Sequence, residues 1–166
     1  DLGINGRVHG VRYEAAALGA LSNAGIEYGG WVPNFQVPQI FGRFRFTVHV
    51  PRRPYATALP GVPTIRMFEA LACGIPLISA PWIDSENLFT AGEDFLFAHD
   101  GGEMRNCMRT LLEDSAMAAE LAAHGRETVL ARHTCAHRVD ELMEIYESLA
   151  AVPFATSEEL TGCETR

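Results

Sequence analysis

The sequence of 166 residues contains no lysine, so all of its positive side-chain charge lies on 13 arginines. Against 21 acidic residues they leave a net charge of −8, which argues against a general polyanion binder such as a nucleic-acid protein. No stretch approaches the roughly 18 consecutive apolar residues of a membrane span. The sequence therefore predicts neither a nucleic-acid partner nor a membrane-spanning segment.

Cysteine is also sparse, and no C-x-x-C pair is present among the four. Three of them fall inside helical patterns as small apolar residues, so a reduced, cytoplasmic protein is the simplest interpretation. The apolar share of 48% and charged share of 20% are those of an ordinary globular domain. The first residue is Asp1 rather than Met, so we expect the amino terminus to be cut from something longer.

The arginines are unevenly distributed along the chain. Residues 1–60 carry six arginines against three acids, a net +3, whereas residues 61–166 carry seven against 18, a net −11. A basic first third in an acidic protein is typical of a local anion site. Chance clustering on a solvated face is the alternative interpretation.

Hydrophobic periodicity alternates between helical and strand-like segments. Strands are predicted at 26–32, where Trp31 should pack in the sheet, and at 46–50, 76–80 and 95–98. Helices are predicted at 13–24, from Thr64 to Cys73, briefly from Glu86, over 104–112, from Ser115, and after Thr134. This order predicts an α/β fold, a Rossmann-like parallel sheet with helices on both faces and a helical carboxyl-terminal end. We expect one domain over 1–152 and a polar, disordered tail over 153–166.

The segment 51–69 concentrates groups that suit a phosphate. Arg52 and Arg53 follow a strand, and the helix that begins at Thr64 exposes free N–H groups at its first turn. Arg66 adds a planar guanidinium, and Glu69 can accept two hydrogen bonds from a vicinal diol. Together these residues would bind a nucleoside diphosphate. The alternative is that Arg66 and Glu69 form an i, i+3 surface pair on an ordinary helix.

The run GVPTIRMFEALACGIPLISAPW over 61–82, with ENLF at 86–89 and GEDFL at 92–96, resembles the carboxyl-terminal domain of GT-B type glycosyltransferases. The resemblance covers about residues 10–149 and is greatest to the bacterial spore-maturation (CgeB-like) group, related to glycosyl transferases group 1. It implies transfer of a sugar from a nucleoside diphosphate sugar to an acceptor hydroxyl, without a cofactor. It also implies that a missing N-terminal lobe completes the enzyme and that this chain alone is an inactive, nucleotide-sugar-binding lobe.

The resemblance also implies roles for individual residues. The backbone amides of Thr64 and Ile65 would hold the diphosphate, and Glu69 would bind the ribose. The loop of Val32, Pro33 and Asn34 would lie near the base.

Two departures from the family pattern leave the catalytic residues unassigned. Related retaining enzymes have a second glutamate where this chain has Gly61. They also use a basic pair on an earlier loop, for which Arg12, Arg52, Arg53 or Arg66 would have to substitute.

A second candidate loop follows the predicted strand at 76–80. Ser79 and Trp82 are placed there, where the indole could stack on a sugar or a base. Asp84 and Glu86 form a D-x-E pattern that occurs in metal sites. Helix capping is the favoured interpretation, and no metal is expected.

Three histidines are candidate metal ligands or catalytic bases. His133 and His137 have a spacing that zinc sites use, but capping and packing are favoured over zinc. His49, inside an apolar strand, is interpreted as a satisfied core or strand-end histidine rather than a base.

Three other functions are considered against the transferase. A non-catalytic nucleotide-sugar-binding module would keep the diphosphate site and lose transfer, as Gly61 suggests. An epimerase or phosphorylase could use the same two-lobe architecture. A response-regulator-like domain would need clustered acids at an early strand end, which this sequence does not show.

Overall fold

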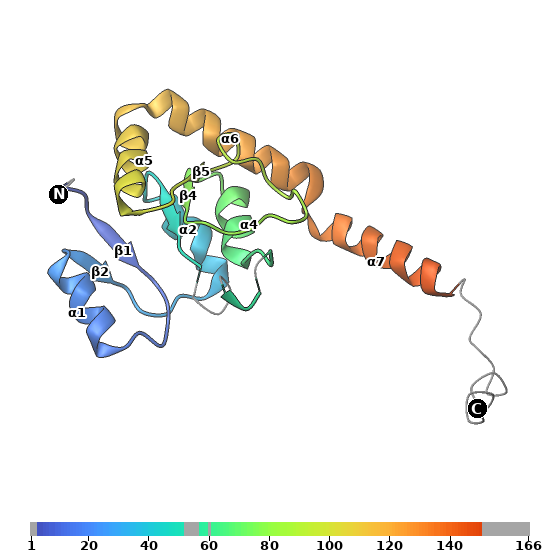
Figure 1. Cartoon of the computed structure of the whole chain (residues 1–166), viewed down its shortest axis with the longest axis horizontal. Helices are drawn as coiled ribbons and strands as arrows, with labels where there is room; N and C mark the ends of the chain where they lie inside the picture. The colour runs from blue at the N-terminus through green and yellow to red at the C-terminus, as the bar shows by residue number, and fades with distance from the viewer. Residues whose placement is uncertain (1–2, 52–56, 60, 151–166) are drawn as a thin grey trace, which may run out of the picture. The chain divides into compact units, whose positions relative to one another are not determined.

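The computed structural model describes residues 3–51, 57–59 and 61–150 (Figure 1). The chain divides into two compact units, Asp1–Leu130 and Ala131–Arg166. Arg52, Arg53 and the tail predicted at 153–166 lie outside the described residues. All of the described strands belong to the first unit.

The described strands are all paired in parallel, in one sheet of two and one of three. They are β1 (Gly6–Val8), β2 (Ile26–Tyr28), β3 (Thr47–His49), β4 (Leu77–Ser79) and β5 (Leu96–Phe97). β1 pairs with β2, and β4 lies between β3 and β5. The predicted α/β fold with parallel pairing is confirmed.

The described helices include all of those predicted except the brief one from Glu86. They are α1 (Ala15–Asn23), the 3-10 helix η1 (Asn34–Gln36), α2 (Val37–Phe41), α4 (Ile65–Ala72), α5 (Gly101–Glu113), α6 (Ser115–Arg132) and α7 (Cys135–Ala150). Gly25 and Gly74 follow α1 and α4 with φ of +69° and +64°. Glycine adopts this left-handed conformation without the steric cost of a side chain, so both residues suit the positions that end these helices.

β4 is buried on both faces, as its continuous apolar sequence predicts. Leu77 lies in a cluster with Met67 and Leu71 of α4, whereas Ile78 lies in a second cluster with Leu111 of α5 and Leu121 of α6. Successive side chains of a strand point to opposite faces, so helices are needed on both sides of the sheet. Figure 1 shows α4 and α5 flanking this strand.

β1 was not predicted, and two local predictions nearby are wrong. β2 ends at Tyr28 rather than at residue 32, because Gly29 and Gly30 follow and Gly30 has a φ of +66°. Trp31 is consequently outside the sheet and 69% exposed, contrary to the prediction that it packs there.

The brief helix predicted from Glu86 is also absent from the structure. Asp84 instead closes a loop, because its two carboxylate oxygens accept the N–H groups of Leu88 and Phe89 at 3.0 and 2.9 Å. Capping of a helix and closing of a loop use the same acceptor chemistry, which is why the sequence did not separate them.

The second unit contains α7. This helix carries an exposed apolar stripe, in which Val139, Leu142, Met143, Tyr146 and Leu149 are each at least half accessible. Thr134 precedes this helix as predicted, and its hydroxyl lies 2.7 Å from His137 Nδ1.

Candidate functional site

Three polar side chains meet where β3, β4 and α4 come together. His49 ends β3 and Ser79 ends β4, and the parallel register pairs the two residues. Thr64 immediately precedes α4, with its Oγ1 2.8 Å from His49 Nε2. These residues lie at the carboxyl ends of parallel strands, where ligands of such sheets bind.

The hydrogen bonds between them have a defined direction. The Ser79 hydroxyl donates to the Ala80 carbonyl at 2.9 Å, so its oxygen accepts from His49 Nδ1–H, also at 2.9 Å. A neutral imidazole with its proton on Nδ1 has an acceptor at Nε2, so the Thr64 hydroxyl donates to it. We assign this tautomer from the direction of the chain that ends at the carbonyl.

His49 is buried, with only 6% of its surface exposed. Burial lowers the pKa of its imidazole from the ordinary value, because removal from water disfavours the charged ring. The ring is therefore neutral at neutral pH and keeps Nε2 as an acceptor. Its hydrogen bonds agree with the interpretation of His49 as a satisfied strand-end histidine.

The amino end of α4 is open. Thr64 has the extended backbone of an N-cap residue, φ −82° and ψ 150°, but its side chain forms no capping hydrogen bond. Among the described residues, nothing accepts from the N–H groups of Ile65 and Arg66. These donors and the positive end of the helix dipole form the kind of group that binds anions.

Arg66 and Glu69 form an ion pair on α4, as the i, i+3 alternative expects. The Arg66 side chain is 56% exposed, whereas that of Glu69 is only 20% exposed. Glu69 is therefore neither in the core nor in bulk solvent. The pair places a guanidinium and a carboxylate one turn from the open helix end.

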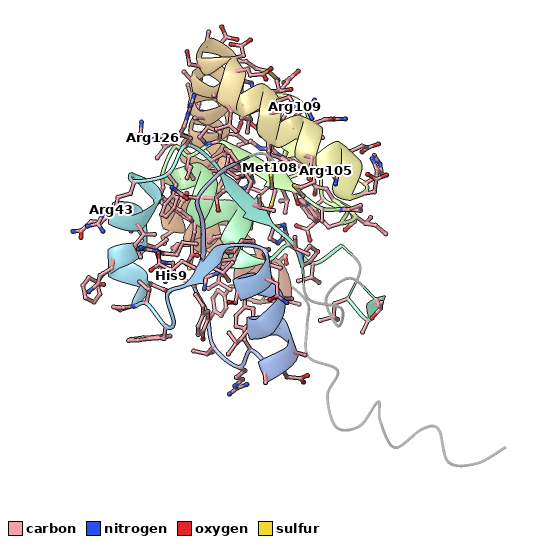
Figure 2. All side chains as sticks on the ribbon, turned by 90° about the vertical axis from the view of Figure 1, so that its left-hand side faces the viewer. His9, Arg43, Arg105, Met108, Arg109 and Arg126 are labelled. Atoms are coloured by element: carbon pink, nitrogen blue, oxygen red, sulfur yellow. The ribbon has the colours of Figure 1, made fainter. Side chains whose placement is uncertain are left out.

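The other arginines do not all gather there. Arg7 binds Glu27 through Nε and Nη2 at 2.8 and 2.6 Å, and Arg45 donates to the Leu112 carbonyl at 2.9 Å. Figure 2 shows Arg105 and Arg109 on α5 and away from β1. Two arginines of the basic first third, Arg7 and Arg45, thus make separate local contacts and do not belong to one cluster.

The sequence pattern of a family described as Glycosyl transferase-like matches residues 1–144. The chain belongs to this family. No protein with a curated description matches the sequence.

Solved structures of this kind share the fold. Sucrose-phosphate synthase from Thermosynechococcus elongatus superposes with a TM-score of 0.69 at 18% identity, over 87% of this chain and 38% of its own. HepE of Anabaena, solved with UDP-glucose, gives 0.69 at 18% identity, over 89% and 41%. S. aureus TarM gives 0.67 at 10% identity, over 88% and 29%. The fold is that of a GT-B glycosyltransferase lobe, and the chain spans about two fifths of the first two proteins.

Within this glycosyl transferase-like chain, the backbone conformation and the surroundings of residue 61 favour glycine. Gly61 has a φ of +95°, and a Cβ there would lie 2.8 Å from Ser85 Oγ. A glutamate would be strained in this conformation and would displace the Ser85 side chain. The loop before α4 is therefore built around glycine, in contrast to the glutamate of the retaining enzymes.

The residues predicted near the base lie beyond the end of β2. Val32 and Pro33 are partly buried, and Asn34 is exposed at the start of η1. His9, labelled in Figure 2, lies at the end of the neighbouring strand with its ring against Gly29, where a Cβ would come within 2.3 Å of Cε1. Both ring nitrogens of His9 are buried without a hydrogen-bond partner among the described residues.

Ser79 and Trp82, the two residues predicted to contact a ligand after β4, are more buried than that role suggests. Ser79 is fully buried, so its hydroxyl serves His49 and Ala80. Trp82 packs against the core cluster of α4, and its Nε1 is buried without a partner in the described part of the chain.

No group of three or more metal-ligating side chains is found among the described residues. His137 contacts Thr134 through Nδ1, which is the capping arrangement favoured over zinc. None of the described helices has the length and hydrophobicity that a membrane crossing requires.

Sequence reasoning missed a buried cluster around Asp94, which is 1% exposed. Its Oδ1 accepts from His124 Nδ1 at 2.8 Å and from Thr128 Oγ1 at 2.7 Å, and its Oδ2 accepts from the Thr90 N–H at 2.6 Å. The hydrogen bond to Asp94 raises the pKa of His124. Thirty residues separate the carboxylate from the imidazole, and no local pattern could indicate their contact.

Proposed function

We propose that the chain is the donor-binding lobe of a glycosyltransferase and that the diphosphate of a nucleoside diphosphate sugar binds at the amino end of α4. The observation that carries the proposal is the pair of unaccepted N–H groups of Ile65 and Arg66 beside the Arg66 guanidinium. Helix N–H groups and arginine together favour an anion with several oxygens. The UDP-glucose in HepE supports this ligand class for a lobe of the same fold.

In the proposed complex, Arg66 exchanges its contact with Glu69 for the diphosphate oxygens. The carboxylate of Glu69 is then free to accept two hydrogen bonds from the ribose diol. Arg52 and Arg53 are assigned to the diphosphate, and residues 32–34 to the surroundings of the base. Ser79 and Trp82 support the site from the core side, because both are largely withdrawn from solvent.

The proposed reaction joins the acceptor oxygen to the anomeric carbon. The bond from that carbon to the diphosphate oxygen breaks, and the acceptor hydroxyl loses its proton. Arginine and the helix N–H groups offset the charge of the departing diphosphate, so the proposal assigns this work to no metal or cofactor. We further propose that the protein belongs to the bacterial CgeB-like group and acts in the cytoplasm.

The proposal includes a second lobe. GT-B catalysis occurs between two lobes, and this chain spans only 38% and 41% of the first two structures it matches. We therefore expect the 166-residue chain to bind donor and to transfer no sugar by itself. Sugar transfer by this chain alone in a progress assay would contradict that part.

Thermal unfolding with added nucleotides tests the site. UDP at 100 times its dissociation constant should stabilise the chain by about 2.7 kcal/mol. Arg66→Ala should weaken both UDP and inorganic pyrophosphate by about tenfold or more, because it removes a charge-assisted contact. Glu69→Ala should weaken UDP more than pyrophosphate, since only UDP carries the ribose.

A matched control is available on α7. Arg138 pairs with Glu141 at 2.9 Å in the same i, i+3 arrangement as Arg66 and Glu69. Arg138→Ala should leave the UDP-induced shift unchanged. If both arginine variants behave alike, or if no nucleoside diphosphate stabilises the wild-type chain, the proposed site is wrong.

One observation favours a second candidate, a binding module that has lost transfer. Gly61 has a backbone that does not suit the glutamate of the retaining enzymes. Sugar transfer by the full-length protein, abolished by Glu69→Ala, would exclude this candidate. Donor binding without transfer by the full-length protein would establish it.

A further inference from the structure

One buried titratable side chain, His49, lies outside the proposed donor contacts. It is 94% buried, it contacts no charged residue in the described part of the chain, and both of its ring nitrogens are used. One of these contacts reaches Thr64, the residue that precedes the open helix end. His49 therefore contacts the residue at the start of the proposed diphosphate site, where it can influence ligand binding.

Thr64 is in a conformation from which it should cap its own helix. Its backbone is extended, and threonine is among the residue types preferred at this position. A capping threonine would present its oxygen to the N–H groups of the first turn. Here that side chain is instead turned toward His49 Nε2.

The direction of the hydrogen bonds explains why this arrangement persists. The Ala80 carbonyl can only accept, so the Ser79 hydroxyl must donate its proton to it. The Ser79 oxygen then accepts from Nδ1–H of His49, which leaves Nε2 as the acceptor for the Thr64 hydroxyl. If Thr64 rotated back to its helix, the buried Nε2 of His49 would lose its hydrogen-bond donor. Buried polar groups without partners are costly, so the rotation is opposed.

We propose that His49 is a positioning residue for the donor site: by binding the Thr64 hydroxyl, it keeps the first-turn N–H groups of α4 free for a diphosphate. This inference rests on the proposed function. His49 itself touches neither donor nor acceptor, and it acts only through Thr64. Without its ring acceptor, the hydroxyl of Thr64 returns to the helix and competes with the ligand.

Calorimetric titration of the whole chain with UDP tests the inference. His49→Leu removes the acceptor, and UDP should bind about five- to tenfold more weakly, because a capping hydroxyl now occupies the same N–H groups. His49→Gln supplies an amide oxygen that can accept from Thr64, and it should restore most of the affinity. A purely structural role for the imidazole would not separate these two variants.

The decisive measurement is a cycle with Thr64→Val, which has no hydroxyl to compete. In that background, adding His49→Leu should cause no further loss of UDP affinity. If His49→Leu does not fold, Ser79→Ala replaces it, since the imidazole then loses the partner that orients it. An equal loss of affinity in both backgrounds would overturn the inference.

The nitrogen-15 spectrum of the His49 ring gives an independent check. It should show a neutral ring protonated at Nδ1 near pH 7, and a proton on Nε2 would contradict the assigned direction. Wild-type binding of UDP with unchanged affinity in His49→Leu would overturn this inference alone. Failure of the wild-type chain to bind UDP and pyrophosphate would overturn the proposed function and the role of His49 with it.

Discussion

Two helices of the first unit begin in opposite ways. α5 begins after Asp100, whose Oδ1 accepts the N–H groups of Gly102 and Glu103 at 2.7 and 2.9 Å. α4 begins after Thr64, whose hydroxyl is bound by His49. Aspartate and threonine are both common capping residues, and both have extended backbones here. A capping residue therefore marks a helix start but does not decide whether the N–H groups of the first turn are used.

The difference lies in what each capping residue has as a neighbour. Among the described residues, the Asp100 side chain accepts hydrogen bonds only from its own helix, and Glu103 additionally accepts from the His99 N–H at 2.8 Å. Thr64 has a buried imidazole beside it, supplied by β3. An end with its own carboxylate repels a second anion, whereas the uncapped end of α4 attracts one.

The largest effect is expected from giving α4 the capping residue of α5. Thr64→Asp places a carboxylate where the diphosphate is proposed to bind, so UDP affinity should fall by about 100-fold or more. Calorimetric titration measures the change. Asn106→Asp, which adds the same charge on the exposed face of α5, should have little effect. Equal losses in the two variants would mean that net charge, not the helix end, governs binding.

A smaller effect is expected when α5 is opened. Asp100→Ala should lower the melting temperature by about 2–4 °C at neutral pH, because two N–H groups lose their acceptor. The backbone hydrogen bonds from Glu103 and Gly102 lower the pKa of Asp100 below 3.8. Its stabilisation is therefore present above pH 3.8 and is lost as the pH falls through the lowered pKa.

The difference in melting temperature between Asp100→Ala and wild type should accordingly disappear in acid. Asp100→Asn keeps an oxygen acceptor and should recover part of the lost stability. UDP affinity should remain that of the wild type in both variants. Gain of UDP binding at an opened α5 would contradict the view that Arg66 and Glu69 are also required.

The smallest effect concerns Asp94, a buried carboxylate that also accepts a backbone N–H. Its hydrogen bond raises the pKa of His124, so this contribution is complete below the ordinary value of 6.5 and is lost as the pH rises through the raised pKa. The free energy of unfolding should therefore decline modestly above neutrality. His124→Gln should flatten this decline in urea titrations at about pH 6 and about pH 9. An unchanged slope would show that the exposed imidazole contributes little.

The fold could be predicted further than the site. The apolar run at 76–80 gave β4 and its burial on two faces, and Gly25 and Gly74 marked the ends of α1 and α4. These are local signals, since backbone conformation and periodicity depend on neighbouring residues. β1 escaped prediction because its three residues, one of them Arg7, carry too short a pattern. Asp84 was ambiguous because its acceptor chemistry serves a loop as well as a helix.

At the site, the sequence indicated the residues but not their contacts. Thr64, Arg66 and Glu69 are close in sequence, so their placement on one helix start followed from spacing. The burial of Ser79 and the exposure of Trp31 did not follow, because each depends on which segments come to lie beside it. The sequence shows that Gly61 departs from the family pattern. It does not show the reason, which is a φ of +95° and the closeness of the Ser85 side chain.

The alternation of strands and helices, the glycines after α1 and α4, and the arginine at the start of α4 can all be read from neighbouring residues. Two contacts required the folded chain: His49 binds the hydroxyl of Thr64, 15 residues away, and Asp94 binds His124, 30 residues away. The physical reason is one of range: propensity and periodicity act over a few residues, whereas the direction of a buried hydrogen bond is fixed by whichever distant group the fold brings to it.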